Sequence, residues 1–178
     1  DLYVDFGTTS REETQALGVE AGDYMGFARE GSVLNNGKFY TGKSVDDRAG
    51  CAVLVEALRR LQDEELDVTV CMVGSVQEEV GMRSGAPLAN RLNPELFLAV
   101  DVTLTGDTPG VEINKCSERM SAGPGIKFYD WDPILGATGN NVPRKVTSAL
   151  IQTAKKHNIP FQREVMTGGG TDAWSAAM

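Results

Sequence analysis

The sequence lacks two features that would point to particular classes of protein. Lys and Arg number 17 against 25 Asp and Glu, and the formal net charge is −8 with no block of basic residues. This balance argues against nucleic acid or an anionic membrane as a partner. No apolar run approaches the roughly 20 residues that a membrane-spanning helix needs. The sequence therefore predicts neither a nucleic-acid-binding protein nor a membrane-spanning one.

Cysteine and histidine are also scarce. The three cysteines, Cys51, Cys71 and Cys116, include no Cys-x-x-Cys pair. Cys51 and Cys71 stand among apolar residues, which is typical of small core residues in a reduced, cytoplasmic protein. The one histidine, His157, follows a predicted helix, where the helix dipole favours a solvated cation. We interpret it as a solvated residue at a helix end and not as a ligand.

The remaining composition is that of an ordinary globular protein. With 178 residues, 41% hydrophobic and 24% charged, the chain can bury the core of one domain, or of one domain and a fragment. Residues 1–41 combine short β-prone pieces with glycine, and Asn36-Gly37 between two of them predicts a hairpin. We expect part of a small β-rich unit over residues 1–41, and a separate α/β part over residues 42–178.

Hydrophobic periodicity predicts the elements of both parts. The helices are expected at 11–17, 47–61, 86–92 and 143–154, with another beginning near 171; the strands are expected at 2–6, 24–27, 33–34, 38–40, 68–73, 96–100, 111–113, 126–128 and 161–165. From residue 42, strands that alternate with helices predict a three-layer α/β sandwich. Because the last helix stops within a turn or two, which is too short to be stable, we expect a piece of a longer protein.

Acidic residues follow the two strands with the most continuous apolar character. Glu78-Glu79 come shortly after the predicted strand 68–73, and Asp101 directly follows the predicted strand 96–100. Asp46 stands where a loop enters a helix. Neighbouring parallel strands lie about 4.8 Å apart and end at the same sheet edge, where ligands bind. We therefore expect these carboxylates to converge.

Converging carboxylates need balancing positive charge, or some of them must stay protonated. Only Arg48 and Arg83 are near in the sequence, which is too little for such a cluster. Oxygen ligands with few thiols favour a divalent ion such as zinc, cobalt or manganese. Side chains of successive residues in extended backbone point to opposite sides. Glu78 and Glu79 are therefore expected to differ in role, so that one coordinates a metal ion and the other transfers a proton.

Each of these residues also has a purely structural interpretation. Glu78 and Glu79 could be solvated residues of a loop. Asp46 and Asp47 could simply cap a helix near its N-terminus, and we interpret Asp47 as a cap or as a residue that orients the site.

The glycine-rich loop before the last helix has two interpretations as well. Gly170, Thr171 and Asp172 either form a plain strand-to-helix turn or line a substrate site. Glycines let a substrate approach the backbone closely, and the amides that follow can hold a carbonyl or carboxylate.

Five short motifs occur in order along the chain. They are Val45-Asp46-Asp47-Arg48-Ala49-Gly50, Gln77-Glu78-Glu79-Val80-Gly81, Asp101-Val102-Thr103, Asp107-Thr108-Pro109-Gly110 and Gly168-Gly169-Gly170-Thr171-Asp172-Ala173. Together they resemble the glutamyl and tetrahedral aminopeptidase family of dinuclear metallopeptidases. The resemblance covers most of the chain and implies a three-layer α/β sandwich of the zinc-peptidase type. It also implies that residues 1–41 are part of a β-rich insert domain of the dimerisation type and that residues 42–178 are part of the catalytic domain.

The resemblance also implies a role for each acidic residue. Asp46 is expected to bridge two metal ions, zinc or cobalt, with Glu79 on one ion and Asp101 on the other. Glu78 is expected to be the general base, and the peptide bond after Asp46 is often cis in such proteins. The resemblance implies a cytoplasmic enzyme that removes N-terminal residues from peptides and assembles as a homo-oligomer, from dimer to dodecamer.

One departure from the family leaves alternatives open. The family has two further ligands, both histidines, and His157 matches neither position. The sequence as given is therefore expected to bind metal poorly and to have no peptidase activity, so a non-catalytic fragment is the alternative. An endoglucanase is a third interpretation, disfavoured because glycoside hydrolysis keeps one carboxyl group protonated, whereas carboxylates around metal are ionised.

Overall fold

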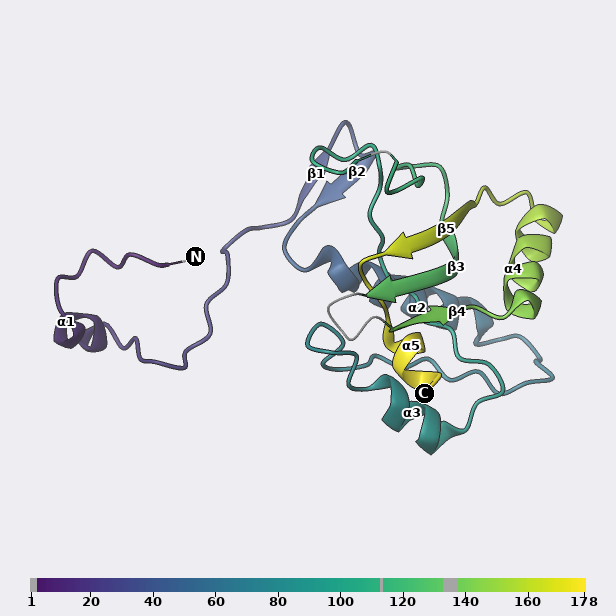
Figure 1. Ribbon diagram of the computed structural model, residues 1–178, viewed down its shortest axis with the longest axis horizontal. Helices are drawn as coiled ribbons and strands as arrows, with labels where there is room; N and C mark the ends of the chain where they lie inside the picture. Colours follow the sequence, from purple (N-terminus) through teal and green to yellow (C-terminus); the bar gives the residue numbers. More distant parts are fainter. Residues whose placement is uncertain (1–2, 113, 133–137) are drawn as a thin grey trace. The chain divides into compact units, whose positions relative to one another are not determined.

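The structure is a computed structural model that describes residues 3–112, 114–132 and 138–178 (Figure 1). Two compact units make up the chain, one over Asp1–Val45 and the other over Asp46–Met178. All the acidic residues singled out above belong to the second unit, so that unit carries the candidate site.

The helix of the first unit is α1 (Arg11–Ala16). The Ser10 hydroxyl accepts a hydrogen bond from the Glu13 N–H at 3.1 Å, and a Glu13 carboxylate oxygen accepts one from the Thr9 N–H at 2.8 Å. These reciprocal bonds satisfy amides that the first helical turn leaves free. The predicted helix is confirmed.

The hairpin of the first unit is formed by β1 (Ser32–Leu34) and β2 (Phe39–Thr41), which pair antiparallel around Asn36-Gly37. This confirms the hairpin that the Asn-Gly pair predicts. The strands predicted at 2–6 and 24–27 are wrong for residues 3–6 and 24–27, which form no ladder; Leu2 lies outside the described residues.

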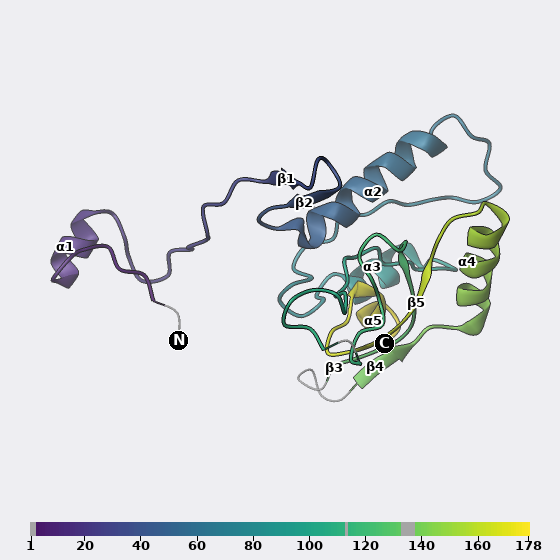
Figure 2. The same cartoon turned by 90° about the horizontal axis from the view of Figure 1, so that it is seen from above.

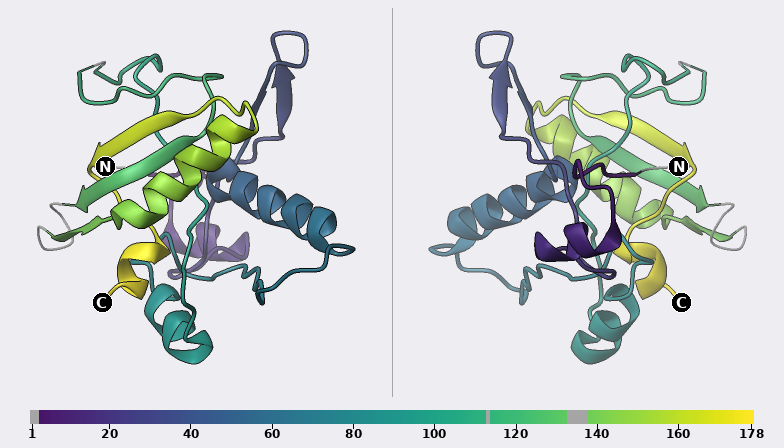
Figure 3. Two further views of the ribbon diagram at one scale, coloured as in Figure 1. Left: turned by 90° about the vertical axis from the view of Figure 1, so that its right-hand side faces the viewer. Right: turned by 90° about the vertical axis from the view of Figure 1, so that its left-hand side faces the viewer.

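The sheet of the second unit has the strand order β4-β3-β5. β5 (Gln162–Thr167) runs parallel to the central β3 (Gly125–Asp132), and β4 (Thr138–Asn141) runs antiparallel to it. α4 (Arg144–Lys156) joins β4 to β5 and lies across one face of the sheet (Figure 3). Three apolar residues of this helix and sheet are buried: Ile126, Ile151 and Ala154.

Three more helices belong to the described part of this unit. α2 (Val45–Leu61) has non-helical backbone at Asp46 and Asp47, so its regular part starts after the two acids. α3 (Gly85–Leu92) and α5 (Asp172–Ala176) lie side by side although they are far apart in the sequence (Figures 1 and 2). The helices predicted from apolar periodicity are all confirmed.

Two predicted strands are wrong. Residues 68–73 and 96–100 belong to no strand, and no ladder in the described chain includes them. Val68 and Leu96 are 65% and 54% exposed, so these segments are not buried on both faces. A β-prone sequence forms a strand only where a neighbour supplies hydrogen bonds and apolar cover, and no described segment does so here. Residues 111–112 form no strand either, and Ile113 lies outside the described residues.

The mixed α/β class is therefore confirmed. Among the described residues the sheet is smaller than the predicted sandwich needs, because the segments 68–73 and 96–100 do not join it. The three-layer arrangement stays a prediction.

The cysteines differ from the sequence-based interpretation. Cys51 and Cys71 are exposed, and all three cysteines are free. The expectation that these two are core residues is wrong, because apolar neighbours in the sequence are not covered in space: Val53 of α2 is 55% exposed and Val70 is 43% exposed. None of the helices in the described ranges has the length and apolarity that crossing a membrane requires.

Candidate functional site

Three aspartates form the centre of the candidate site. Asp46, Asp47 and Asp101 each offer a carboxylate oxygen, and these oxygens lie within 4.8 Å of one another. Asp46 and Asp47 stand at the start of α2 and are joined by a cis peptide bond, as the resemblance implies. Asp101 follows residues 96–100, which belong to no helix or strand. The structure thus brings Asp46 and Asp101 together and adds Asp47 to them.

Asp47 is held by the first turn of α2. Its Oδ1 accepts a hydrogen bond from the Gly50 N–H at 2.9 Å. Burial, together with the charge of Asp46, raises the pKa of Asp47. A Cβ atom on Gly50 would overlap the Asp47 carboxylate. Asp47 is therefore a helix cap, as the sequence suggested, whose position depends on a glycine three residues later.

Replacing Gly50 with alanine is expected to weaken the binding of zinc or cobalt by roughly 10- to 100-fold, the range for changes to residues that support a metal site. The added methyl group would push the Asp47 carboxylate out of the cluster. Calorimetric titration of the protein expressed from its full reading frame measures the affinity.

Gly74→Ala is the matched control for this experiment. A Cβ on Gly74 meets no atom within 4 Å, so the same chemical change is made in open space and the affinity should stay at the wild-type value. A wild-type affinity for Gly50→Ala as well would show that Asp47 has no part in binding.

Glu78 and Glu79 lie in a tight turn and not at a strand end. Gln77, just before them, has a left-handed backbone with φ of 62°. The Glu78 carbonyl accepts hydrogen bonds from the N–H groups of Gly81 at 3.1 Å and Met82 at 2.7 Å. These bonds give both glutamates a defined backbone although no sheet supports them.

The charges of these glutamates and of the aspartates act on one another. Burial raises the pKa of Glu78 to about 7, and the negative charges of Asp101 and Asp172 add to the effect. The charge of Asp46 raises the pKa of Glu79, although Glu79 is not one of the three groups that meet within 4.8 Å. Burial also raises the pKa of Asp101 to about 6. All these carboxylates therefore face a shared region of high negative potential.

Positive charge does not balance this region. The ion pairs of the described residues involve none of its acids, and the guanidinium of Arg83 donates to the Val80 carbonyl at 3.1 Å instead. The charge of Lys127 lowers the pKa of Asp101, but it is the weakest of the effects that act on that pKa. Crowded carboxylate oxygens without cations are the donor set that a divalent ion satisfies.

The glycine-rich loop joins β5 to α5. Thr171 caps α5, because its hydroxyl accepts from the Ala173 N–H at 3.3 Å. Asp172 is only 6% exposed, and its Oδ1 accepts from the Gly85 N–H at 3.2 Å. The side chains of Thr171 and Asp172 are thus engaged inside the protein, while Gly170 is half-buried at the end of the loop.

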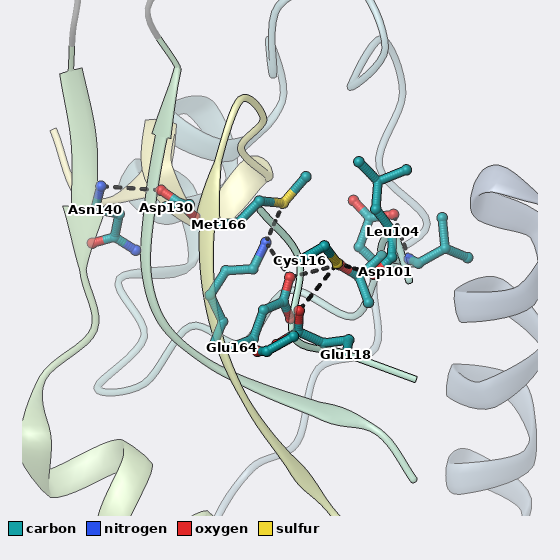
Figure 4. A network of polar contacts seen from close by, with 12 residues as sticks. Asp101, Leu104, Cys116, Glu118, Asp130, Asn140, Glu164 and Met166 are labelled. Carbon is teal, nitrogen blue, oxygen red and sulfur yellow. Dashed lines mark hydrogen bonds and ion pairs between the residues drawn. The ribbon is translucent and has the colours of Figure 1, made fainter. Parts of the chain in front are cut away.

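A polar network close to Asp101 has no counterpart in the sequence analysis (Figure 4). The buried Glu164 accepts from the Thr103 hydroxyl at 2.6 Å and pairs with the Lys127 amine at 3.5 Å. The buried Glu118 accepts from the Cys116 thiol at 3.2 Å, and burial raises the pKa of that thiol. Thr103, Cys116, Glu118 and Glu164 line a cavity of about 260 Å³. The contact between Thr103 and Glu164 spans 61 residues, so the sequence gives no local signal for it.

His157 ends α4 and is exposed. This position agrees with the interpretation of His157 as a solvated residue at a helix end.

Comparison with known proteins gives a consistent picture. The M42 glutamyl aminopeptidase family matches residues 1–178, the whole of the chain. A putative aminopeptidase of Acetivibrio thermocellus is 37% identical over 174 residues, which is 98% of this chain and 48% of that protein.

Two solved structures are similar in fold as well as in sequence. A TET aminopeptidase from a marine sediment archaeon of the Thaumarchaeota has a TM-score of 0.86 and 37% identity, and the match covers 97% of this chain and 47% of that one. PhTET1-12s, solved as a dodecamer in the asymmetric unit, has a TM-score of 0.74 and 33% identity, over 96% of this chain and 48% of that one. The chain spans about half the length of the relatives it matches.

Proposed function

The chain belongs to the M42 glutamyl aminopeptidase family, and from this membership we propose that it carries the acidic part of a metal-dependent site that removes N-terminal residues from peptides. Membership confirms the resemblance that the five motifs predicted. The observation that carries the proposal is the meeting of Asp46, Asp47 and Asp101 within 4.8 Å, beside Glu78 and without a balancing cation. That arrangement supports metal-assisted hydrolysis.

The residues proposed to hold metal are Asp46, Glu79 and Asp101. Asp46 stands at the centre of the set, because its carboxylate meets that of Asp101 and its charge acts on Glu79. We propose two divalent ions, zinc or cobalt, with Asp46 shared between them. A divalent ion held there would activate water and polarise the scissile carbonyl. Asp47 supports the set from the first turn of α2.

Glu78 is the proposed general base. Its pKa of about 7 lets the carboxylate take a proton and return it near neutral pH. Peptide hydrolysis needs both transfers, because the water loses a proton and the departing amine gains one. Burial is the main cause of the raised pKa, although Glu78 is only partly buried.

The remaining assignments concern substrate and assembly. We propose that the glycine-rich loop around Gly170 and Thr171 borders the bound peptide. In this proposal the backbone groups of the loop, and not its side chains, contact the peptide. A homo-oligomer is proposed by analogy with the PhTET1-12s dodecamer. A cytoplasmic location is proposed from the three free cysteines, and the three-layer sandwich and the insert domain over residues 1–41 are kept as proposals.

Turnover of aminoacyl-nitroanilides tests the proposed function. The protein expressed from its full reading frame, loaded with zinc or cobalt, is expected to release nitroaniline from at least one of a panel with acidic, basic and apolar side chains. A chelator should abolish the activity and added metal should restore it. Carboxymethylcellulose serves as the competing substrate: its hydrolysis, with no turnover of any aminoacyl-nitroanilide, would replace the peptidase proposal with a glycosidase.

A further inference from the structure

A pair of hydrogen bonds fastens α5 to the first residue of α3 and to the segment just before it. The Asp172 Oδ1 accepts from the Gly85 N–H at 3.2 Å, and the Ser175 hydroxyl donates to the Met82 carbonyl at 2.7 Å. Asp172 and Ser175 are each 6% exposed, so water competes little for either bond. The two bonds join positions that lie 87 and 93 residues apart in the sequence.

Asp172 makes this contact instead of capping its own helix. Thr171 already caps α5 through the Ala173 N–H, so the Asp172 carboxylate is free to point toward α3. Its Oδ1 carries the bond to Gly85, whereas its Oδ2 is buried and has no hydrogen-bond partner among the described residues. The contact therefore depends on one acceptor atom, which an asparagine side chain can also supply.

The close approach is built into the backbone of both segments. A Cβ on Gly85 would overlap the Ser175 hydroxyl and the Asp172 carbonyl, and a Cβ on Gly170 would lie 3.2 Å from the Met82 sulfur. Met82 is itself 4% exposed. Two glycines thus make room for a contact that larger residues would block.

The fastened segment is the one that carries Glu78. The Met82 N–H donates to the Glu78 carbonyl at 2.7 Å, and the Arg83 N–H donates to the Gln77 carbonyl at 3.3 Å. The Val76 N–H donates to the Ser84 hydroxyl at 3.2 Å. Residues 76–85 therefore form one hydrogen-bonded turn. Asp172 and Ser175 bond the C-terminal part of this turn to α5, and the Glu79 side chain bonds to Asp46.

We propose that Asp172 is a positioning residue for Glu78: its hydrogen bond to Gly85 fixes the turn 76–85, and with it the glutamate, relative to the aspartate cluster. This inference rests on the proposed function, in which Glu78 is the general base. A general base acts only within hydrogen-bond reach of the proton that it takes. A shift of about 1 Å can lower the rate by roughly 10²-fold.

Asp172→Ala and Asp172→Asn test the proposal in the metal-loaded protein from the full reading frame. Asp172→Ala is expected to lower kcat on an aminoacyl-nitroanilide by about 10²-fold, with KM and metal content close to wild type. Asp172→Asn keeps the acceptor and should restore kcat to within about threefold of wild type. Hydrogen exchange at residues 77–85 should be faster in the alanine variant than in the asparagine variant.

Several results would overturn the proposal. A wild-type kcat for Asp172→Ala would do so, as would an Asp172→Asn variant as slow as Asp172→Ala. Should Asp172→Ala fail to fold, Ser175→Ala removes the bond to Met82, together with a bond of the same hydroxyl to the Asp172 carbonyl within α5. This variant is expected to lower kcat at unchanged KM, by less than the roughly 10²-fold expected for Asp172→Ala. An unchanged kcat in Ser175→Ala would overturn the proposal. A wild-type protein that binds metal yet turns over no aminoacyl-nitroanilide refutes the proposed function, and this inference falls with it.

Discussion

Glu78→Gln is expected to lower kcat by roughly 10²- to 10⁴-fold while the metal content stays at the wild-type value. The amide keeps the size and shape of the side chain but cannot accept a proton from water. The pKa of Glu78, raised to about 7 by burial and by neighbouring charges, is the property that suits it to proton transfer. Steady-state kinetics on an aminoacyl-nitroanilide, together with metal analysis of the same sample, measures both quantities.

Glu79→Gln is the matched control, since the same substitution is made one residue along the same turn. If Glu79 binds metal, its variant should lose metal and activity together. The opposite pattern, with metal lost in Glu78→Gln and kept in Glu79→Gln, would show that the two glutamates have exchanged roles.

Asp46→Ala is expected to weaken the binding of zinc or cobalt by more than about 100-fold, because even changes outside the ligand shell cost roughly 10- to 100-fold. Asp46 meets both Asp47 and Asp101, and its charge is the largest of the effects that raise the pKa of Glu79. Activity should be lost with the metal. Calorimetric titration and metal analysis on the protein from the full reading frame give the affinity.

Asp63→Ala controls for the general effect of removing one aspartate. Asp63 is exposed beyond the end of α2, so its variant should bind metal as the wild type does. Tight binding that survives in Asp46→Ala would remove Asp46 from the site, and Asp101 would then be the residue to examine.

Local signals predicted the elements whose stability depends on nearby residues. The short helix α1, the Asn36-Gly37 turn and the periodic helices α2 and α4 were all found where the sequence predicted them. The strands predicted at 68–73 and 96–100 did not form, because a strand needs a partner that no local pattern specifies. β4 was missed, and its Thr-Gly-Asn-Asn sequence shows no apolar alternation.

The candidate site also contains some residues that the sequence predicted and others that it did not. The order of the motifs brought attention to Asp46 and Asp101, which the structure places together. Asp47 was interpreted only as a cap or orienting residue, since nothing in a linear pattern shows that its carboxylate also meets those two. The contact from Asp172 to Gly85 spans 87 residues, and a burial-dependent bond of that kind has no local signature.

That long span also has a consequence for the order of events during synthesis. The turn that carries Glu78 can close its own hydrogen bonds as soon as Arg83 and Ser84 are made. The helix that fastens it arrives about 90 residues later, and closing so long a loop carries a larger entropy cost than a local turn. At roughly 5–20 residues per second, the ribosome needs about 5 to 20 s to add these residues, so α5 cannot hold the turn before then. Until α5 is made, Glu78 is held by the hydrogen bonds within its own turn and not by those from Asp172 and Ser175.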